Sequence, residues 1–150
     1  IYSPKYDGET QTEFEKFMSD NGELENPQLK KDFDAIIAAI KKIIDDCGAR
    51  ENLFRPEGNN IKAIPLCIEQ RRGKGVGTLR LYCIRISGKI LIIGNGGIKR
   101  VKRYEDDPIL LDIVNKLRSI EHQIFIGTRK IHADYDDYQK VKMIIEAITI

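Results

Sequence analysis

The sequence is poor in the residues that build disulfides and metal centres. It has 3 cysteines and 2 histidines among 150 residues. Cys47, Cys67 and Cys83 form no C-x-x-C pair and leave an odd thiol, which argues against a disulfide framework. His122 and His132 each stand alone, without the regularly spaced further ligands that a metal site needs. We therefore expect reduced, partly buried thiols, no metal and no cofactor.

Long apolar runs are absent as well. None approaches the roughly 18 residues that a membrane span requires, and there is no signal-peptide pattern. A hydrophobic content of 41% with 32% charged residues is typical of a globular protein. A chain of this length is expected to fold as one domain, residues 1–150. We expect a cytoplasmic protein with no membrane partner.

One stretch also lacks acidic residues, although the whole chain carries a formal charge of only +2. Residues 71–103 hold ten lysines and arginines and no Asp or Glu, so the other 117 residues sum to −8. Segregated cations create a local positive potential that attracts polyanions. The alternative is a solvated sheet edge whose cations discourage aggregation. We favour a surface that binds nucleic acid or phosphate.

Apolar periodicity predicts an α+β fold: an N-terminal helix hairpin packed on a small, mainly antiparallel sheet, followed by C-terminal helices. Helices are expected at 10–20, opened by a capping box at Thr10 and Glu13, and at 26–48, opened by Asn26 and Pro27. Asp107 and Pro108 open a third helix, and a fourth is expected at about 135–147.

Alternation places strands at 61–68, 79–87 and 89–93. Ser87-Gly88 predicts a tight hairpin turn in which glycine supplies a positive φ. In the second strand Arg80 and Tyr82 share a face. Two glycine-rich stretches, 71–77 and 94–97, could cradle phosphate with backbone N–H groups. Neither matches a nucleotide-binding fingerprint, and we expect both to turn the chain.

Several residue types in the basic stretch suit RNA chemistry. Metal-free cleavage needs a base for the 2′-OH, charge stabilisation at phosphorus and an acid for the 5′-oxygen. Guanidinium suits the second role, a lysine with a lowered pKa suits the first or third, and tyrosine can stack on a base or relay a proton. The catalytic candidates are Arg80, Lys99, Arg100 and Tyr82. The candidates for RNA binding are Arg71, Arg72, Lys74, Arg85, Lys102, Arg103 and Tyr104.

The segment LRLYC at 79–83 resembles the Y-R-I-F-Y strand of the HigB-like, phage-derived branch of the RelE/ParE toxin superfamily. The segment ILIIGNGGIKRVKR at 90–103 is similar to that branch's apolar strand and its lysine-rich exit, and Asp107-Pro108 resembles the start of its next helix. The resemblance covers about residues 61–120. It matches Arg80 to the strand arginine, and Lys99 and Arg100 to the exit lysines.

This resemblance implies a RelE-like domain of a bacterial type II toxin-antitoxin system. The expected activity is ribosome-dependent mRNA cleavage that inhibits translation, and the expected partners are the ribosome, mRNA and a cognate antitoxin. Two alternatives remain open. One is a non-catalytic nucleic-acid-binding module, such as a decayed toxin. The other is a domain that docks an acidic protein partner, such as an antitoxin or a topoisomerase.

Overall fold

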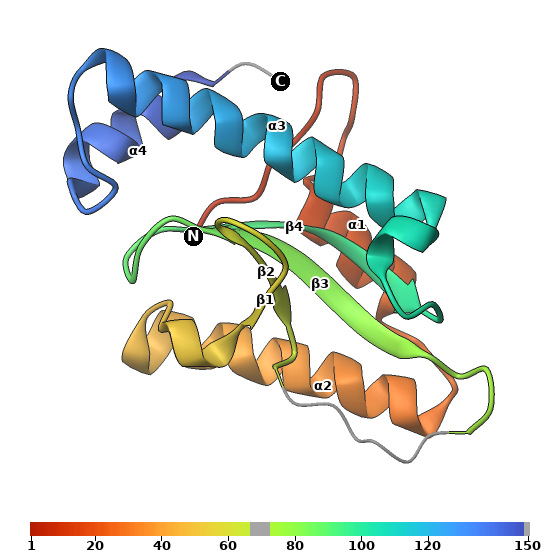
Figure 1. The fold of residues 1–150 in the computed structure, drawn as a ribbon. Helices are drawn as coiled ribbons and strands as arrows, with labels where there is room; N and C mark the ends of the chain where they lie inside the picture. The colour runs from red at the N-terminus through yellow and green to blue at the C-terminus, as the bar shows by residue number, and fades with distance from the viewer. Residues whose placement is uncertain (67–72, 149–150) are drawn as a thin grey trace.

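The computed structural model describes residues 1–66 and 73–148, which form a four-stranded antiparallel sheet between two layers of helices (Figure 1). The strand order is β1-β2-β3-β4. This architecture confirms the predicted α+β fold. The elements in chain order are α1 (Glu13–Asn21), α2 (Pro27–Lys42), the π-helical turn η1 (Ile43–Cys47), the 3-10 turn η2 (Glu51–Leu53), β1 (Arg55–Pro56), β2 (Ile61–Ile64), β3 (Thr78–Arg85), β4 (Leu91–Lys99), the 3-10 turn η3 (Tyr104–Asp106), α3 (Pro108–Lys130) and α4 (Tyr138–Ala147).

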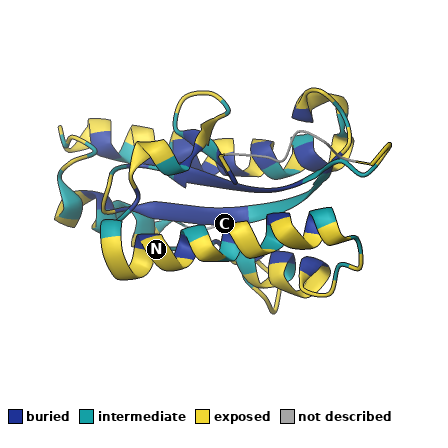
Figure 2. Cartoon of the chain, turned by 90° about the horizontal axis from the view of Figure 1, so that it is seen from below, coloured by how far each residue is buried: buried dark blue, intermediate teal, exposed yellow. Residues whose placement is uncertain are grey.

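Both faces of the sheet are buried (Figure 2). Alternate residues of β3 enter two cores, because successive side chains of a strand point to opposite faces. Leu79 and Leu81 pack in the core beneath α1 and α2. Tyr82 and Ile84 pack in the core beneath α3 and α4. Arg80, two residues before Tyr82, therefore lies on the α3 face.

The starts of the two longest helices were predicted correctly. The Asn26 side chain accepts from the backbone N–H groups of Gln28 and Leu29, and Pro27 is the first residue of α2. The Asp107 side chain caps α3 in the same way, ahead of Pro108. Such caps satisfy N–H groups that have no partner inside the helix.

The predicted capping box of α1 was misplaced by two residues. Thr12, not Thr10, accepts from the backbone of Glu15, and the Glu15 carboxylate accepts from the Thr12 N–H at 2.7 Å. α4 likewise begins later than predicted, at Tyr138 behind its cap Asp137. β2 ends at Ile64 because Pro65 has no N–H to donate. The rest of the strand predicted at 61–68 lies partly outside the described residues.

The prediction that the glycines at 94–97 break the second hairpin strand was wrong. β4 runs through them to Lys99, with a shift of register opposite Leu81 and Cys83. The two strands approach closely here, as the space around Gly96 shows. A Cβ placed on Gly96 would lie 1.8 Å from the carbonyl oxygen of Arg80. Gly96 therefore belongs to an irregularity inside the strand, where the backbone of β3 leaves no room for a side chain. A Cβ on Gly94 or Gly97 would instead meet Leu117 or Leu110 of α3.

The turn between β3 and β4 also differs from the prediction. Gly88 has no positive φ. The chain reverses through residues 87–89, and Ile86 N–H donates to the Ile90 carbonyl at 3.1 Å. The antiparallel hairpin itself is confirmed. Because β4 is continuous, Lys99 pairs with Thr78 and Gly97 with Arg80, so Lys99 comes close to Arg80 at one end of the sheet.

Candidate functional site: a basic cavity at one end of the sheet

A small cavity of about 270 Å³ opens where β4 ends and the chain enters α3. Its walls come from β1, the turn after β1, the end of β4 and the segment before α3. Four cationic side chains and two carboxylates line it, so its formal charge is +2. The lining residues are Arg55, Pro56, Glu57, Lys99, Lys102, Arg103, Tyr104 and Glu105.

Lys99 is the most enclosed cation of this cavity, with 9% of its surface exposed. Burial lowers its pKa, because removal from water disfavours the ammonium form. Glu57 opposes this shift, whereas the positive charges of Arg55 and Arg80 add to it. A lysine in this setting gives up its proton more readily than a solvated one.

Arg80 and Tyr82 lie behind the cavity, under α3, and do not line it. Arg80 is 1% exposed and Tyr82 is fully buried. One guanidinium nitrogen of Arg80 donates to the Pro65 carbonyl. Its Nε and the Tyr82 hydroxyl have no hydrogen-bond partner among the described residues. Unpartnered buried polar atoms are rare in folded proteins, and they often mark functional sites.

Burial shifts the pKa values of both buried groups. It lowers the pKa of Arg80, an effect that nearby Arg55 increases and Glu57 opposes. It raises the pKa of Tyr82, and Glu57 raises it further. Tyr82 therefore remains a neutral phenol, and Arg80 adds positive charge beneath the cavity floor. The charges of both Glu57 and Arg55 act on the pKa values of Arg80, Tyr82 and Lys99.

Tyr104 forms a fixed wall of the cavity. Its ring meets Tyr82 edge to face, with 6.0 Å between ring centroids. Its hydroxyl accepts a hydrogen bond of 2.5 Å from Arg118 on α3. The Arg118 guanidinium also lies 5.8 Å from the ring centroid. These three contacts hold the aromatic ring in place at the cavity edge.

The structure brings together some of the predicted site residues and separates others. Lys99, Lys102, Arg103 and Tyr104 line the cavity, and Arg80 and Tyr82 lie behind it. Arg100 turns away, with its Nε donating to the Gly75 carbonyl at 2.9 Å. Lys74 is exposed on the preceding loop. Arg71 and Arg72 lie outside the described residues.

Arg85 lies at the far end of β3. Its Nε donates to the Ala49 carbonyl at 2.6 Å, and its Nη1 lies 3.4 Å from a Glu51 carboxylate oxygen. Strand alternation also points it to the α2 face, away from Arg80. These contacts give it a role in holding the segment after α2 on the sheet.

Sequence reasoning missed Arg55 and Glu57. They lie in and just after β1, a strand of two residues whose partner is β2, with Arg55 opposite Ala63. Their charged groups lie 3.7 Å apart. Residues 50–60 show no strand periodicity, so no local signal placed this pair beside Lys99.

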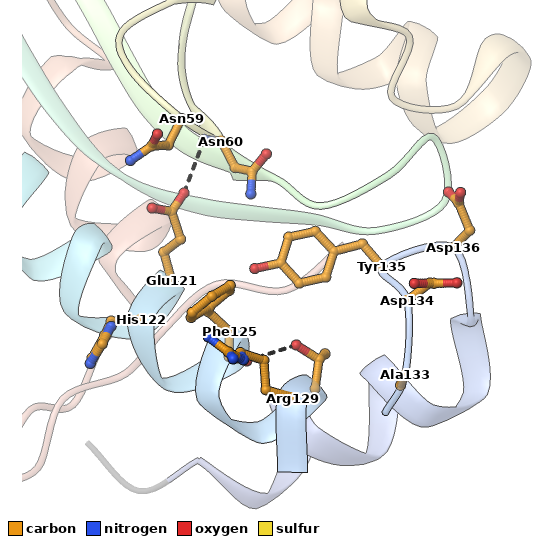
Figure 3. A pocket seen from close by; sticks show the side chains of 11 residues that line it. Asn59, Asn60, Glu121, His122, Phe125, Arg129, Ala133, Asp134, Tyr135 and Asp136 are labelled. Carbon is orange, nitrogen blue, oxygen red and sulfur yellow. Dashed lines mark hydrogen bonds between the residues drawn. The ribbon is translucent and has the colours of Figure 1, made fainter. Parts of the chain in front are cut away.

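A larger cavity of about 860 Å³ lies along the second half of α3 (Figure 3). It is lined from the β1–β2 turn, from α3 and from the loop that follows α3, and none of the predicted site residues contributes. Glu121 on α3 is buried, and its carboxylate accepts from the Asn60 N–H at 3.0 Å. The other residues that line the larger cavity include Asn59, Phe125, Arg129 and Tyr135.

Within the part of the chain that the structure describes, no three His, Cys, Asp or Glu side chains are grouped so that they could hold a metal ion. No described helix is long and apolar enough to cross a membrane.

Comparisons with protein-family models, with curated proteins and with solved structures find no match for this chain.

Proposed function

We propose that this protein is an endoribonuclease that cuts mRNA on the ribosome, and that it is the toxin component of a type II toxin-antitoxin system. The observation that carries the proposal is the basic cavity, where an enclosed lysine, a carboxylate and several cations meet above unpartnered buried donors. This arrangement suits an RNA phosphate flanked by a 2′-hydroxyl. The ribosome, the antitoxin and the cytoplasmic location come from the resemblance to the RelE/ParE superfamily.

The cavity supplies each group that metal-free cleavage requires. The Glu57 carboxylate accepts the 2′-OH proton, and the 2′-oxygen attacks the adjacent phosphorus. Arg55, beside Glu57, stabilises the charge that develops on the phosphoryl oxygens. The bond from phosphorus to the 5′-oxygen then breaks, and the Lys99 ammonium protonates that oxygen. The products are a 2′,3′-cyclic phosphate and a 5′-hydroxyl.

The remaining residues position the substrate and tune this chemistry. Lys102 and Arg103 are exposed at the cavity rim, where they can pair with neighbouring phosphates. Arg80 does not contact the substrate. Its positive charge instead lowers the pKa of Lys99. Solvent carries the proton from Glu57 back to Lys99 between turnovers.

A second candidate is an RNA-binding module without cleavage. The burial of Arg80 and Tyr82 favours this candidate. Neither side chain lines the cavity, so neither can contact a bound RNA as a catalytic group. Such a module keeps the cationic rim and its affinity for RNA, but it releases no product.

Primer extension on a reporter mRNA in a cell-free translation reaction separates these functions. We expect cuts only when ribosomes translate, and a loss of cutting of at least about 100-fold in Lys99→Ala, the range of one acid–base group. The matched control is Lys41→Ala, because Lys41 is an exposed lysine on α2. An intact message with folded wild-type protein contradicts the nuclease, and retained RNA binding then supports the second candidate.

A further inference from the structure

The basic cavity and the larger cavity share one wall, the turn between β1 and β2. Glu57 lines the first cavity, whereas Asn59 and Asn60 line the second. Between them, a Cβ placed on Gly58 would lie 3.6 Å from a guanidinium nitrogen of Arg118. Two residues of extended chain span at most about 7 Å, so the two cavities are immediate neighbours.

α3 connects the same two cavities on its exposed side. Arg118 bonds to Tyr104 in the basic cavity, and His122, Phe125 and Arg129 line the larger one. These four residues recur at the spacing i, i+4, i+7 and i+11, which places them on one helical face. Cationic and aromatic side chains in one row are the pattern that proteins use to hold single-stranded nucleic acid.

The larger cavity offers flat surfaces on two sides. Phe125 is 44% exposed, and the Arg129 guanidinium lies 5.5 Å from its ring centroid. Tyr135 reaches across from the loop after α3, with its hydroxyl toward the helix (Figure 3). Burial raises the pKa of Tyr135, and Glu121 raises it further, so this phenol stays neutral. Neutral aromatic rings and guanidinium planes stack readily on nucleobases.

Glu121 adds a hydrogen-bond acceptor to these flat walls. The residue is 9% exposed, and one carboxylate oxygen accepts from the Asn60 N–H. The other oxygen makes no hydrogen bond within the described residues. A carboxylate oxygen that lines a cavity and has no donor favours a ligand that brings an N–H group. Asp134 and Asp136 also line the cavity and repel phosphate, so they leave Arg118 and Arg129 as the contacts for an RNA backbone.

We propose that the larger cavity is a base-binding subsite for single-stranded RNA, an inference that rests on the proposed function. The nucleotide next to the one held in the basic cavity places its base against Phe125 and Tyr135. Its exocyclic amino group donates to the free oxygen of Glu121. The subsite therefore prefers adenine, cytosine or guanine over uracil, which has no amino group and whose single N3–H lies between two carbonyl oxygens that repel a carboxylate.

Fluorescence anisotropy with short 2′-O-methyl oligonucleotides, which cannot be cleaved, tests this subsite. We expect the wild-type protein to bind oligo-A and oligo-C more tightly than oligo-U. Phe125→Leu should weaken binding of all three about fivefold or more, the effect of losing one stacked base. Glu121→Gln keeps an acceptor for Asn60 N–H and should remove the preference against oligo-U. The control is Ile44→Ala, at a side chain 63% exposed beyond α2.

The results separate this inference from the proposed function. If Phe125→Leu and Glu121→Gln bind every oligonucleotide as the Ile44→Ala control does, the subsite is wrong, even where the wild-type protein still cuts mRNA during translation. Equal affinity of the wild-type protein for oligo-A, oligo-C and oligo-U, or no affinity for any of them, also overturns it. Loss of cutting during translation, by contrast, refutes the nuclease itself.

Discussion

Lys99 carries the acid step of the proposed reaction, and its surroundings define how that step depends on pH. Burial, Arg55 and Arg80 lower its pKa below the ordinary lysine value. A general acid must be protonated, so the rate falls as pH rises through this lowered pKa. The alkaline limb of the pH profile should therefore lie below the range of a solvated lysine.

Lys99→Arg should move that limb to higher pH. Arginine keeps the positive charge but holds its proton throughout the accessible range, with a pKa above about 12. Its maximal rate should also fall, since a group that does not release its proton is a poor acid. The measurement is the single-turnover cleavage rate between about pH 6 and 10. An unchanged alkaline limb in Lys99→Arg would show that another group donates the proton.

The residues around Lys99 also show how much of the candidate site could be predicted from the sequence. Arg80, Tyr82, Lys99, Lys102 and Arg103 lie within residues 71–103, and Tyr104 follows directly, so composition and strand alternation singled them out as candidates. Glu57 and Arg55 reach the site only because β1 pairs with β2. That contact is specified by long-range packing, which leaves no periodic signal in a strand of two residues.

At the scale of elements, local signals predicted best. The caps at Asn26 and Asp107 depend on side chains that bond to their own neighbours, so the sequence alone reveals them. The glycines at 94–97 show the opposite case. Four residues rich in glycine predict a turn, whereas in the structure they continue β4, with Gly96 in close contact with β3. Only the position of the neighbouring strand shows whether such a segment is a turn or part of a strand.

Gly96→Ala tests this explanation of β4. A Cβ at this position meets the backbone of Arg80, which cannot rotate away, so the strands must separate. We expect the free energy of unfolding to fall by about 1–3 kcal/mol or more, the usual range for overpacking. Urea denaturation measures the change.

Gly88→Ala is the matched control for that substitution. Gly88 lies in the turn after β3, has no positive φ, and no heavy atom lies within 4 Å of its added Cβ. The free energy of unfolding should change by less than about 0.5 kcal/mol, as for most surface substitutions. Equal stability of the two variants would mean that β3 and β4 do not approach closely at Gly96.

In the whole molecule, helices cover both faces of the sheet. A ligand can therefore reach the strands only at the ends and edges of the sheet. The chain passes from the end of β4 to α3 at one end of the sheet (Figure 1). Lys99, Lys102 and Arg103 line the cavity at this end, while Arg85 and Arg100 hold other segments in place. The residues outside 71–103 sum to −8, which favours one orientation toward a polyanion.

The proposed function depends on cleavage of RNA through the 2′-hydroxyl at the basic cavity, without a metal. This step is tested by mapping the cleavage of an mRNA on translating ribosomes, with a single 2′-deoxynucleotide placed at the cut site. We expect this substitution to abolish the cut there, and we expect the all-ribose message to yield a 2′,3′-cyclic phosphate and a 5′-hydroxyl. Continued cutting at the deoxynucleotide, or products that carry a 5′-phosphate, would show that the 2′-hydroxyl is not the nucleophile.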